Sequence, residues 1–266
     1  MLGLCRKDSR IRSFLWAARY AAVADHFASS LPASRPKRYR RRVATTPTPL
    51  TEETLVLAVG ELAARDPDLS GIVARFGPPP MWDRPPGFAT LAHIVLEQQV
   101  SLASAQAAFD RLGAAVGSLT PDRFLELGDS ELLAIGFSRQ KTRYVRNLAE
   151  SIAGGRLDLE GLATLPDEEV HDALVALTGI GPWTASIYLL MALRRPDVWP
   201  ATDMALAAAV AEVRGLDRRP GLDQMQAIGA PWRPWRSAAA RLFWHDYVSR
   251  RGRGGGGAGI GGVAAP

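Results

Sequence analysis

The sequence predicts an all-α protein, and three observations support this prediction. Across residues 50–249, apolar residues recur at spacings of three and four, which is the period of helices that bury one face. Glycine and proline separate these segments, and runs with strand-like alternation are scarce. With 47% hydrophobic residues in a chain of 266, there is enough apolar material for one large or two small cores. Because no fixed period repeats along the chain, a solenoid is not expected.

Capping residues indicate several helix boundaries. Ser101, Asp129 and Ser138 can accept hydrogen bonds from the first free amides of a helix, while Gly113 and Gly136 stand where helices end. The expected helices span residues 52–64, 69–76, 87–97, 101–112, 122–127, 129–134, 138–154, 158–163, 167–177, 182–193, 203–213 and 235–250.

The positive charge of the chain is concentrated near its start. The net charge is +5, but residues 1–48 hold eleven Lys or Arg against Asp8 and Asp25, so this segment carries +9 and the rest carries −4. Residues 1–48 are expected to form a basic, disordered extension that is either idle or an arm that holds polyanions. Residues 49–249 are expected to form the folded domain and the Gly/Ala-rich residues 250–266 a disordered tail. A folded domain of this charge must bind nucleic acid through a local patch and backbone donors.

The composition excludes several classes of protein. A single cysteine, Cys5, cannot build a disulfide framework or a thiolate-ligated metal cluster within one chain. The four histidines do not occur at metal-ligand spacing, so a zinc hydrolase is not expected. The longest apolar run, residues 14–23, is interrupted by Arg19 and is too short to span a membrane.

A glycine-rich turn between two helical patterns is the most informative motif. Residues 174–185 read LVALTGIGPWTA, so Gly179 and Gly181 lie between one helix and the next. Exposed amides at the start of the second helix suit a phosphate. The alternative is a plain glycine cap followed by Pro182 at the first helical position.

An aspartate follows this hairpin at a fixed distance. Asp203 lies twenty positions after Trp183, beyond two helix-stopping prolines, and opens an alanine-rich helix. The helix dipole favours a carboxylate at this place. Asp203 is therefore a candidate functional carboxylate or a simple N-cap, a task that Thr202 could share.

Together these motifs resemble a known family. The segment GIGPWTA at 179–185 with Pro200-x-x-Asp203 resembles the helix-hairpin-helix/Gly-Pro-Asp superfamily of DNA glycosylases. Three more segments resemble its DNA-3-methyladenine glycosylase II branch: residues 94–101 (IVLEQQVS), 135–143 (IGFSRQKTR) and 232–241 (WRPWRSAAAR). The resemblance covers about residues 66–247 and implies a two-lobed helical fold. The β-rich N-terminal domain of some branch members is not matched.

The resemblance implies roles for single residues. The aspartate at the position of Asp203 is catalytic in this family, and a carboxylate suits the positive charge that develops on the sugar as the base leaves. Trp183 and Trp244 would line the base pocket, where an electron-rich ring favours a cationic alkylated base; the alternative is that both fill cores. Members that also cut the backbone carry a lysine where this chain has Trp183, so a monofunctional enzyme is expected.

The resemblance also implies contacts with DNA. The turn at Gln98, Gln99 and Ser101 would enter the minor groove, with Gln99 as the wedge that fills the gap left by the flipped base; the alternative is a polar helix end. The hairpin residues that would contact the DNA are Thr178, Gly179, Ile180, Gly181 and Thr184. The backbone carbonyls of Thr178 and Ile180 would hold Na⁺ or K⁺, and no organic cofactor is implied. Arg139, Lys141 and Arg143 form either a solvated helix face or a phosphate clamp.

The function implied by the resemblance is a base excision repair glycosylase for alkylated purines of the 3-methyladenine or 7-methylguanine type. It would act as a monomer on double-stranded DNA after flipping the base. The alternatives are a glycosylase for another lesion, such as uracil, hypoxanthine or an oxidised purine, and a non-catalytic DNA-binding module. The high Ala, Arg and Gly content with three lysines suggests a high-GC bacterial genome, hence a cytoplasmic, nucleoid-associated protein.

Overall fold

The computed structural model describes residues 47–252, and all regular secondary structure in this range is helical, which confirms the all-α prediction. Most of the expected extension and tail, residues 1–46 and 253–266, lie outside the described residues. None of the described helices is both long enough and apolar enough to cross a bilayer.

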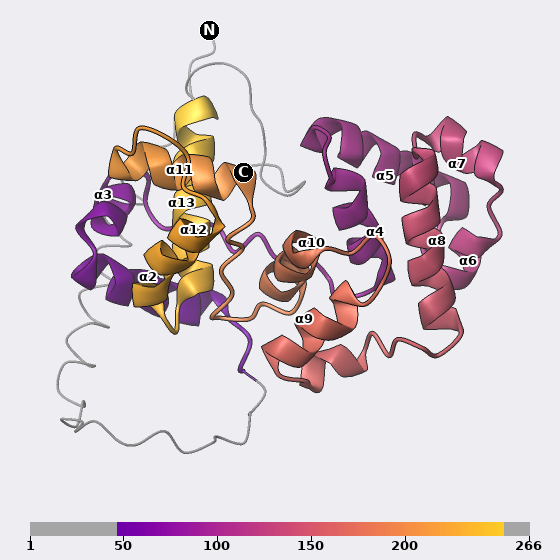
Figure 1. Cartoon of the computed structure of the whole chain (residues 1–266), viewed down its shortest axis with the longest axis horizontal. Coiled ribbons are helices and arrows are strands. Elements are labelled where there is room, and N and C mark those ends of the chain that lie inside the picture. The colour runs from indigo at the N-terminus through magenta and orange to yellow at the C-terminus, as the bar shows by residue number, and fades with distance from the viewer. Residues whose placement is uncertain (1–46, 253–266) are drawn as a thin grey trace, which may run out of the picture.

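The helices form two lobes (Figure 1). We call one the terminal lobe, because it combines the start and the end of the described chain. It contains α2 (Glu52–Arg65), α3 (Pro67–Phe76), α11 (Met204–Arg214), α12 (Leu222–Gly229), a 3-10 turn (Ala230–Trp232) and α13 (Arg236–Gly252). The central lobe contains α4 (Phe88–Glu97), α5 (Leu102–Val116), α6 (Pro121–Leu125), α7 (Asp129–Ile135), α8 (Arg139–Ala153), a 3-10 turn (Gly161–Thr164), α9 (Asp167–Val175), α10 (Pro182–Ile187) and a π-helical segment (Tyr188–Ala192).

The predicted caps at Ser101, Ser138 and Gly136 form, but two others do not. Asp129 is the first residue of α7 after the N-cap Gly128, and α5 continues past Gly113 to Val116. The hydroxyl of Ser101 accepts a hydrogen bond from the amide of Ser104 at the start of α5, and Ser138 does the same for Lys141 at the start of α8. Gly136 ends α7 in the left-handed conformation with φ 112°. Local side-chain chemistry therefore sets these boundaries.

The structure corrects the helix predictions at three further places. Residues 158–163 were expected to be a helix, but the carboxylate of Asp158 binds the amide of Gly161 and a short 3-10 turn follows. The expected helix 182–193 changes to π geometry at Tyr188. The sequence prediction omitted α12, in which Met225 and Gly229 are the buried positions.

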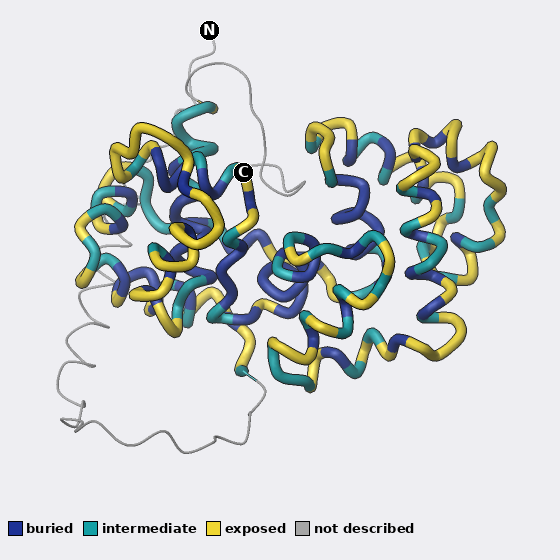
Figure 2. The backbone as a smooth tube through the Cα atoms, in the orientation of Figure 1, coloured by how far each residue is buried: buried dark blue, intermediate teal, exposed yellow. Residues whose placement is uncertain are grey.

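Two extended linkers join the lobes, one between α3 and α4 and the other between the π-helical segment and α11. The side chain of Arg241 is fully buried and donates to the carbonyl of Met81 in the first linker (2.7 Å) and to that of Leu190 in the π-helical segment (3.0 Å). Burial lowers the pKa of Arg241 to about 10. Figure 2 shows the buried stretches of backbone converging where the lobes meet.

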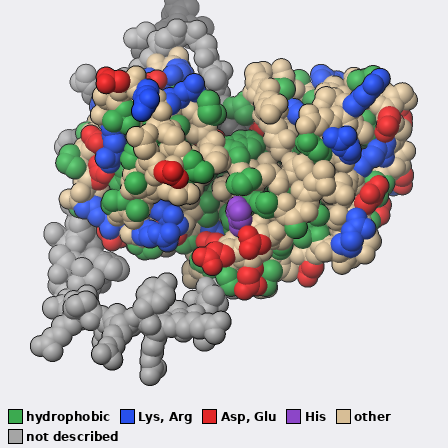
Figure 3. Space-filling view, viewed as in Figure 1, with side chains coloured by type: hydrophobic (Ala, Val, Ile, Leu, Met, Phe, Trp, Pro, Cys, Tyr) green, Lys and Arg blue, Asp and Glu red, His purple; other side chains and the backbone are tan. Residues whose placement is uncertain are grey.

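The surface charge matches a folded domain without an overall positive field. On the face shown in Figure 3, Lys and Arg side chains are spread over both lobes, while hydrophobic side chains appear at their junction. Acidic side chains gather below the junction, where α9 carries Asp167, Glu168 and Glu169 in its first turn. Any anion-binding surface near the junction therefore depends on backbone and polar groups.

Candidate active site

A cleft of about 1230 Å³ lies between the two lobes. The central lobe lines it with the turn between α4 and α5, two residues of α8, the hairpin between α9 and α10, and Met191 of the π-helical segment. The terminal lobe adds the start of α11 together with Trp244 and Tyr247 of α13. The cleft therefore brings together the hairpin with Asp203, the segment 94–101 and Gln140 of the segment 135–143, whereas none of residues 232–241 lines it.

Asp203 caps α11 and lines this cleft, with 9% of its surface exposed. Its Oδ1 accepts hydrogen bonds from the amide of Leu206 (2.6 Å) and the indole of Trp244 (3.2 Å). Its Oδ2 accepts from the indole of Trp183 (2.7 Å). Asp203 is thus both an N-cap and an oriented carboxylate in the cleft, so the two interpretations of the sequence are compatible.

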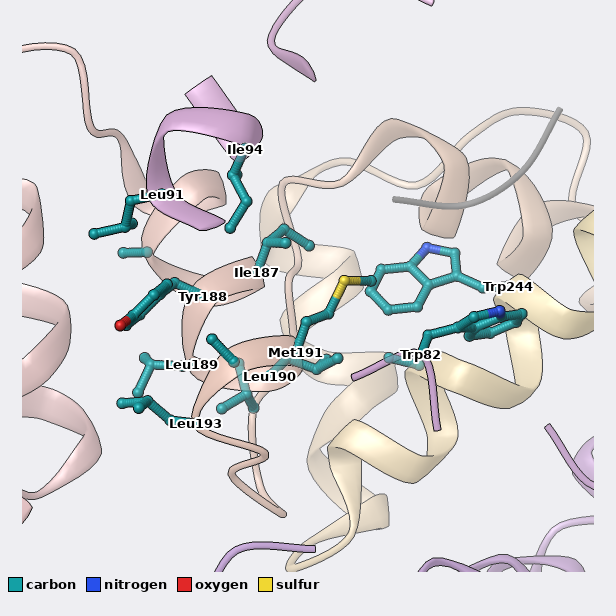
Figure 4. Packing of buried hydrophobic residues seen from close by; sticks show 14 of the residues in the cluster. Trp82, Leu91, Ile94, Ile187, Tyr188, Leu189, Leu190, Met191, Leu193 and Trp244 are labelled. Atoms are coloured by element: carbon teal, nitrogen blue, oxygen red, sulfur yellow. The ribbon is translucent and has the colours of Figure 1, made fainter. Parts of the chain in front are cut away.

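The two tryptophans hold the same carboxylate but differ in exposure. Trp244 is 1% exposed, so its ring is packed inside the protein, whereas Trp183 is partly exposed at the cleft. Figure 4 shows Met191 of the π-helical segment pointing toward the indole of Trp244. Trp183 is therefore the more accessible of the two indoles at the cleft, whereas Trp244 donates to Asp203 from inside the protein.

The hairpin turn requires glycine at position 179. Gly179 has φ +93°, and an added Cβ would lie 2.1 Å from the Tyr144 ring, so a larger residue would collide. Gly181 precedes Pro182 as the N-cap of α10. Tyr144 of α8 lines the cleft beside the hairpin. The turn is thus pressed against α8 with its backbone at the cleft.

Gln98 and Thr184 connect the α4–α5 turn to the hairpin. The side-chain amide of Gln98 donates to the carbonyl of Gly179 and to the hydroxyl of Thr184, each at 3.0 Å. Thr184 is 1% exposed, so its hydroxyl acts inside the protein. Both side chains therefore have protein partners in this structure, and their expected contacts with DNA stay a prediction.

Gln99 and Ser101 are exposed at the rim of the cleft, as a DNA-contacting turn requires. Gln99 has φ 58°, a left-handed conformation that non-glycine residues rarely adopt. Between them, Val100 is 45% exposed. The turn therefore presents strained, exposed residues to the solvent.

The carbonyl oxygens of Thr178 and Ile180, which are expected to hold a monovalent ion, alternate along the chain with carbonyl oxygens that accept hydrogen bonds. Leu177 O accepts from the amide of Ile180, and Gly179 O accepts from Gln98. No hydrogen bond within residues 47–252 reaches the carbonyl oxygens of Thr178 and Ile180. Carbonyl oxygens without such a bond can act as ligands of Na⁺ or K⁺, and the ion site stays a prediction.

The basic residues of α8 do not form a uniform solvated face. Lys141 donates from Nζ to the carbonyl of Leu96 at 2.5 Å, at the end of α4. Partial burial lowers the pKa of Lys141. Arg139 and Arg143 are exposed. Lys141 therefore links α8 to the end of α4 through this hydrogen bond.

Sequence reasoning missed several residues that line the cleft, among them Glu97, Tyr144 and Met204. Glu97 is buried beside Arg84, with a shortest N–O distance of 2.7 Å. Met204 is 63% exposed although it directly follows Asp203. The adjacency of Glu97 and Met204 to recognised motifs was the available signal, whereas the contact of Tyr144 with Gly179 depends on the packing of α8.

Comparisons with known proteins agree with this geometry. Residues 92–234 match the model of the HhH-GPD superfamily of base excision DNA repair proteins. Among curated relatives from Bacillus subtilis (strain 168), YfjP is 31% identical over 57% of this chain and 56% of its own length. A DNA-3-methyladenine glycosylase of the same strain is 29% identical over 69% of this chain and 65% of its own length. The chain thus spans less than two thirds of these relatives.

Solved structures show the same arrangement of helices. The 3-methyladenine DNA glycosylase Mag1 of Schizosaccharomyces pombe, in complex with abasic DNA, aligns with a TM-score of 0.65 at 25% identity, over 71% of this chain and 95% of its own. A DNA-3-methyladenine glycosidase of Bacillus halodurans aligns with a TM-score of 0.62 at 26% identity, over 73% and 91%.

The matched range contains the hairpin, Asp203 and the Gln98–Gln99 turn, which are the features that the cleft brings together. The match extends over more than half of the chain, so it is not limited to one short motif. The chain belongs to the HhH-GPD superfamily of base excision DNA repair proteins.

Proposed function

We propose that this protein is a monofunctional DNA glycosylase that hydrolyses the N-glycosidic bond of alkylated purines and leaves an abasic site. The observation that carries this proposal is the Asp203 carboxylate, which lies in the interlobe cleft with both oxygens held by donors. The relatives and solved neighbours named as 3-methyladenine glycosylases support the substrate class.

The hydrogen bonds of Asp203 leave one oxygen with spare capacity. A carboxylate oxygen can accept about two hydrogen bonds. Within the described residues, Oδ1 accepts two and Oδ2 accepts one. Oδ2 can therefore face the sugar, where it stabilises the positive charge that develops as the base departs, or orient the attacking water.

The accessible ring of Trp183 favours an alkylated purine. Methylation at N3 of adenine or N7 of guanine makes the base cationic, and a cation is attracted to the face of an indole. A cationic base is also a good leaving group, so the reaction needs little help from a general acid. This agrees with Asp203 as the principal charged group at the bottom of the proposed site.

The rim of the cleft supplies the proposed DNA contacts. The exposed turn carries Gln99 as the wedge and Ser101 beside it, and both line the cleft next to the hairpin backbone at Gly179–Gly181. Backbone amides suit phosphate in a domain whose charge is not positive overall. Extruding a base into a pocket is the general route by which enzymes reach its glycosidic bond.

The absence of a strand-cutting activity is part of the proposal. A β-lyase needs an amine that forms a Schiff base with the abasic sugar. Of the three lysines, Lys141 is the one within the described residues, and its Nζ binds the carbonyl of Leu96. It is not among the residues that line the cleft.

The test is chromatography of the bases that the purified protein releases from methylated duplex DNA. We expect release of 3-methyladenine or 7-methylguanine, with strand breaks only after alkali and no covalent complex when borohydride is added. Breaks before alkali together with a trapped complex would show a lyase.

A parallel assay with duplexes carrying uracil, hypoxanthine or 8-oxoguanine distinguishes the other glycosylases. Release from one of these, but not from methylated DNA, would replace the substrate assignment. DNA binding without release of any base would identify a non-catalytic binding module.

A further inference from the structure

Three consecutive residues at the end of α4 are each fixed to a different part of the protein. The carbonyl of Leu96 accepts from Lys141 of α8 at 2.5 Å. Glu97 pairs with Arg84 of the interlobe linker at 2.7 Å. Gln98 donates to the hairpin at Gly179 and Thr184. The residue that follows, Gln99, is exposed at the cleft.

The residues that make these contacts are buried, whereas the turn that they hold is exposed. Arg84 and Glu97 are 8% and 6% exposed, and Thr184 is 1% exposed. Gln99 has the left-handed backbone conformation of φ 58°, which persists only when the surroundings hold it. Buried residues therefore hold a turn whose exposed residue, Gln99, has a strained backbone conformation.

Both donors of the Gln98 side chain are directed at protein acceptors. A primary amide has two N–H donors, and Nε2 of Gln98 bonds to a carbonyl of the hairpin turn and to a hydroxyl of α10. Gln98 therefore has no donor left for a base edge or a phosphate. It spans the distance between the wedge turn and the hairpin.

We propose that Gln98 is a positioning residue that fixes Gln99 relative to the hairpin. The position at which the hairpin binds the DNA backbone then determines where Gln99 enters the duplex. This inference rests on the proposed function. A turn whose backbone is already held in place inserts its exposed residue at a lower entropic cost at the moment of base flipping. Gln98 thereby couples the turn that carries Gln99 to the hairpin, although Gln98 and Gly179 are 81 residues apart in the sequence.

A positioning role and a purely structural role of Gln98 predict different rates for a lesion that is paired and a lesion that has no partner base. Gln98→Leu removes both donors while keeping a similar volume. A wedge matters when a base pair must be broken and matters little when the lesion has no partner. The assay is therefore the single-turnover rate on a 7-methylguanine duplex, with the lesion opposite either cytosine or a tetrahydrofuran abasic analogue.

For Gln98→Leu we expect the rate opposite cytosine to fall about tenfold, as for the loss of one to two net hydrogen bonds, with little change opposite the abasic analogue. Thr184→Val removes one of the two acceptors of the Gln98 amide. We expect it to lower the rate opposite cytosine about threefold, with little change opposite the abasic analogue. Gln106→Leu removes an exposed bond to Asp110 on the neighbouring helix α5 and is expected to leave both rates unchanged.

An equal loss on both substrates by Gln98→Leu and Thr184→Val, at unchanged thermal stability, would overturn the positioning role. Wild-type rates in both variants would also overturn it. If Gln98→Leu does not fold, Thr184→Val alone decides between these results. If the wild-type protein releases neither 3-methyladenine nor 7-methylguanine from methylated DNA, the proposed function fails, and the inference fails with it. If it releases 3-methyladenine alone, the two duplexes carry that lesion instead.

Discussion

At the residue scale, the carboxylate of Asp203 is oriented by groups that are distant in the sequence. Trp183 and Trp244 lie 20 and 41 positions from Asp203, yet both indoles donate to it. One backbone amide, that of Leu206, completes the arrangement. A geometry fixed from three directions suits a group that must face charge developing at one atom.

Trp244→Phe tests this orientation. The substitution keeps a buried aromatic ring and removes one hydrogen bond to the carboxylate, a type of bond worth about 1.5–3 kcal/mol. We expect the single-turnover rate of base release to fall about tenfold or more, with unchanged affinity for duplex DNA that carries an abasic analogue.

Trp235→Phe is the matched control, because its indole binds the carboxylate of Glu61 outside the cleft. It should keep the wild-type rate. Equal losses in both variants would show that Trp244 does not act through Asp203.

The identity of the candidate site residues could be predicted from the sequence, but their bonding could not. The spacing of Asp203 from the hairpin marked it, and the structure places it at the cleft with Trp183 and Trp244. The protein partners of Gln98 and Thr184 depend on packing the hairpin against the end of α4, which joins residues more than 80 positions apart. Local patterns carry no signal for such contacts.

At the element scale, α4 combines a buried polar cluster with the turn that we assign to DNA. His93 is 8% exposed and stacks on Phe109 with a ring separation of 4.2 Å. Burial, helped by the charge of Arg84, lowers the pKa of His93 to about 4, while Asp110 opposes this shift. Burial also raises the pKa of Glu97 on the next turn of the helix.

The lowered pKa of His93 predicts a pH dependence of stability. The unfolded chain binds a proton at this histidine near pH 6.5 and the folded protein near pH 4. The unfolded state therefore holds more protons between these values, so stability falls as the pH falls through this window, by up to about 3 kcal/mol. Because His93→Gln cannot gain this charge, its urea midpoint should fall less between pH 7 and pH 4.

His171→Gln is the comparison for that measurement, since His171 lies in a more exposed position on α9. It should keep the wild-type pH dependence. If His93→Gln and the wild type lose the same stability toward pH 4, then His93 does not titrate as its burial implies.

The prediction of helices succeeded where apolar periodicity and caps agree. α5 and α8 begin after Ser101 and Ser138, as the sequence indicates. α12 was missed because few of its residues are buried, so its apolar period is weak. The change to π geometry at Tyr188 was missed because the apolar period of a helix does not distinguish α from π geometry.

At the scale of the whole molecule, the cleft depends on how the linkers hold the lobes together. Arg241 donates to the carbonyl of Met81 in the first linker, to that of Leu190 in the π-helical segment, and to that of Ser237 in its own helix at 3.3 Å. Arg84 strengthens the same junction, because its amide donates to the carbonyl of Met191. The relative position of the lobes is thus fixed by buried hydrogen bonds to backbone carbonyls.

Arg241→Met should destabilise the protein strongly. Methionine fills part of the space but leaves buried carbonyls without donors, at about 1–3 kcal/mol for each group. We expect the free energy of unfolding in urea to fall by about 2–5 kcal/mol. Arg123→Met removes an ion pair whose two side chains are 62% and 64% exposed, and should change stability by less than about 1 kcal/mol. Similar small effects of both substitutions would contradict the role given to Arg241.

The most direct test of the account is a paired measurement on the wild type and Asp203→Asn. One assay is the single-turnover release of 7-methylguanine from a defined duplex, and the other is the affinity for the same duplex with an abasic analogue. Asp217→Asn, an exposed aspartate in the loop after α11, is the control. We predict that Asp203→Asn binds within about threefold of the wild type but releases base at least about a hundredfold more slowly, while the control matches the wild type in both assays. Release by Asp203→Asn at the wild-type rate would contradict the assignment of the chemistry to this carboxylate.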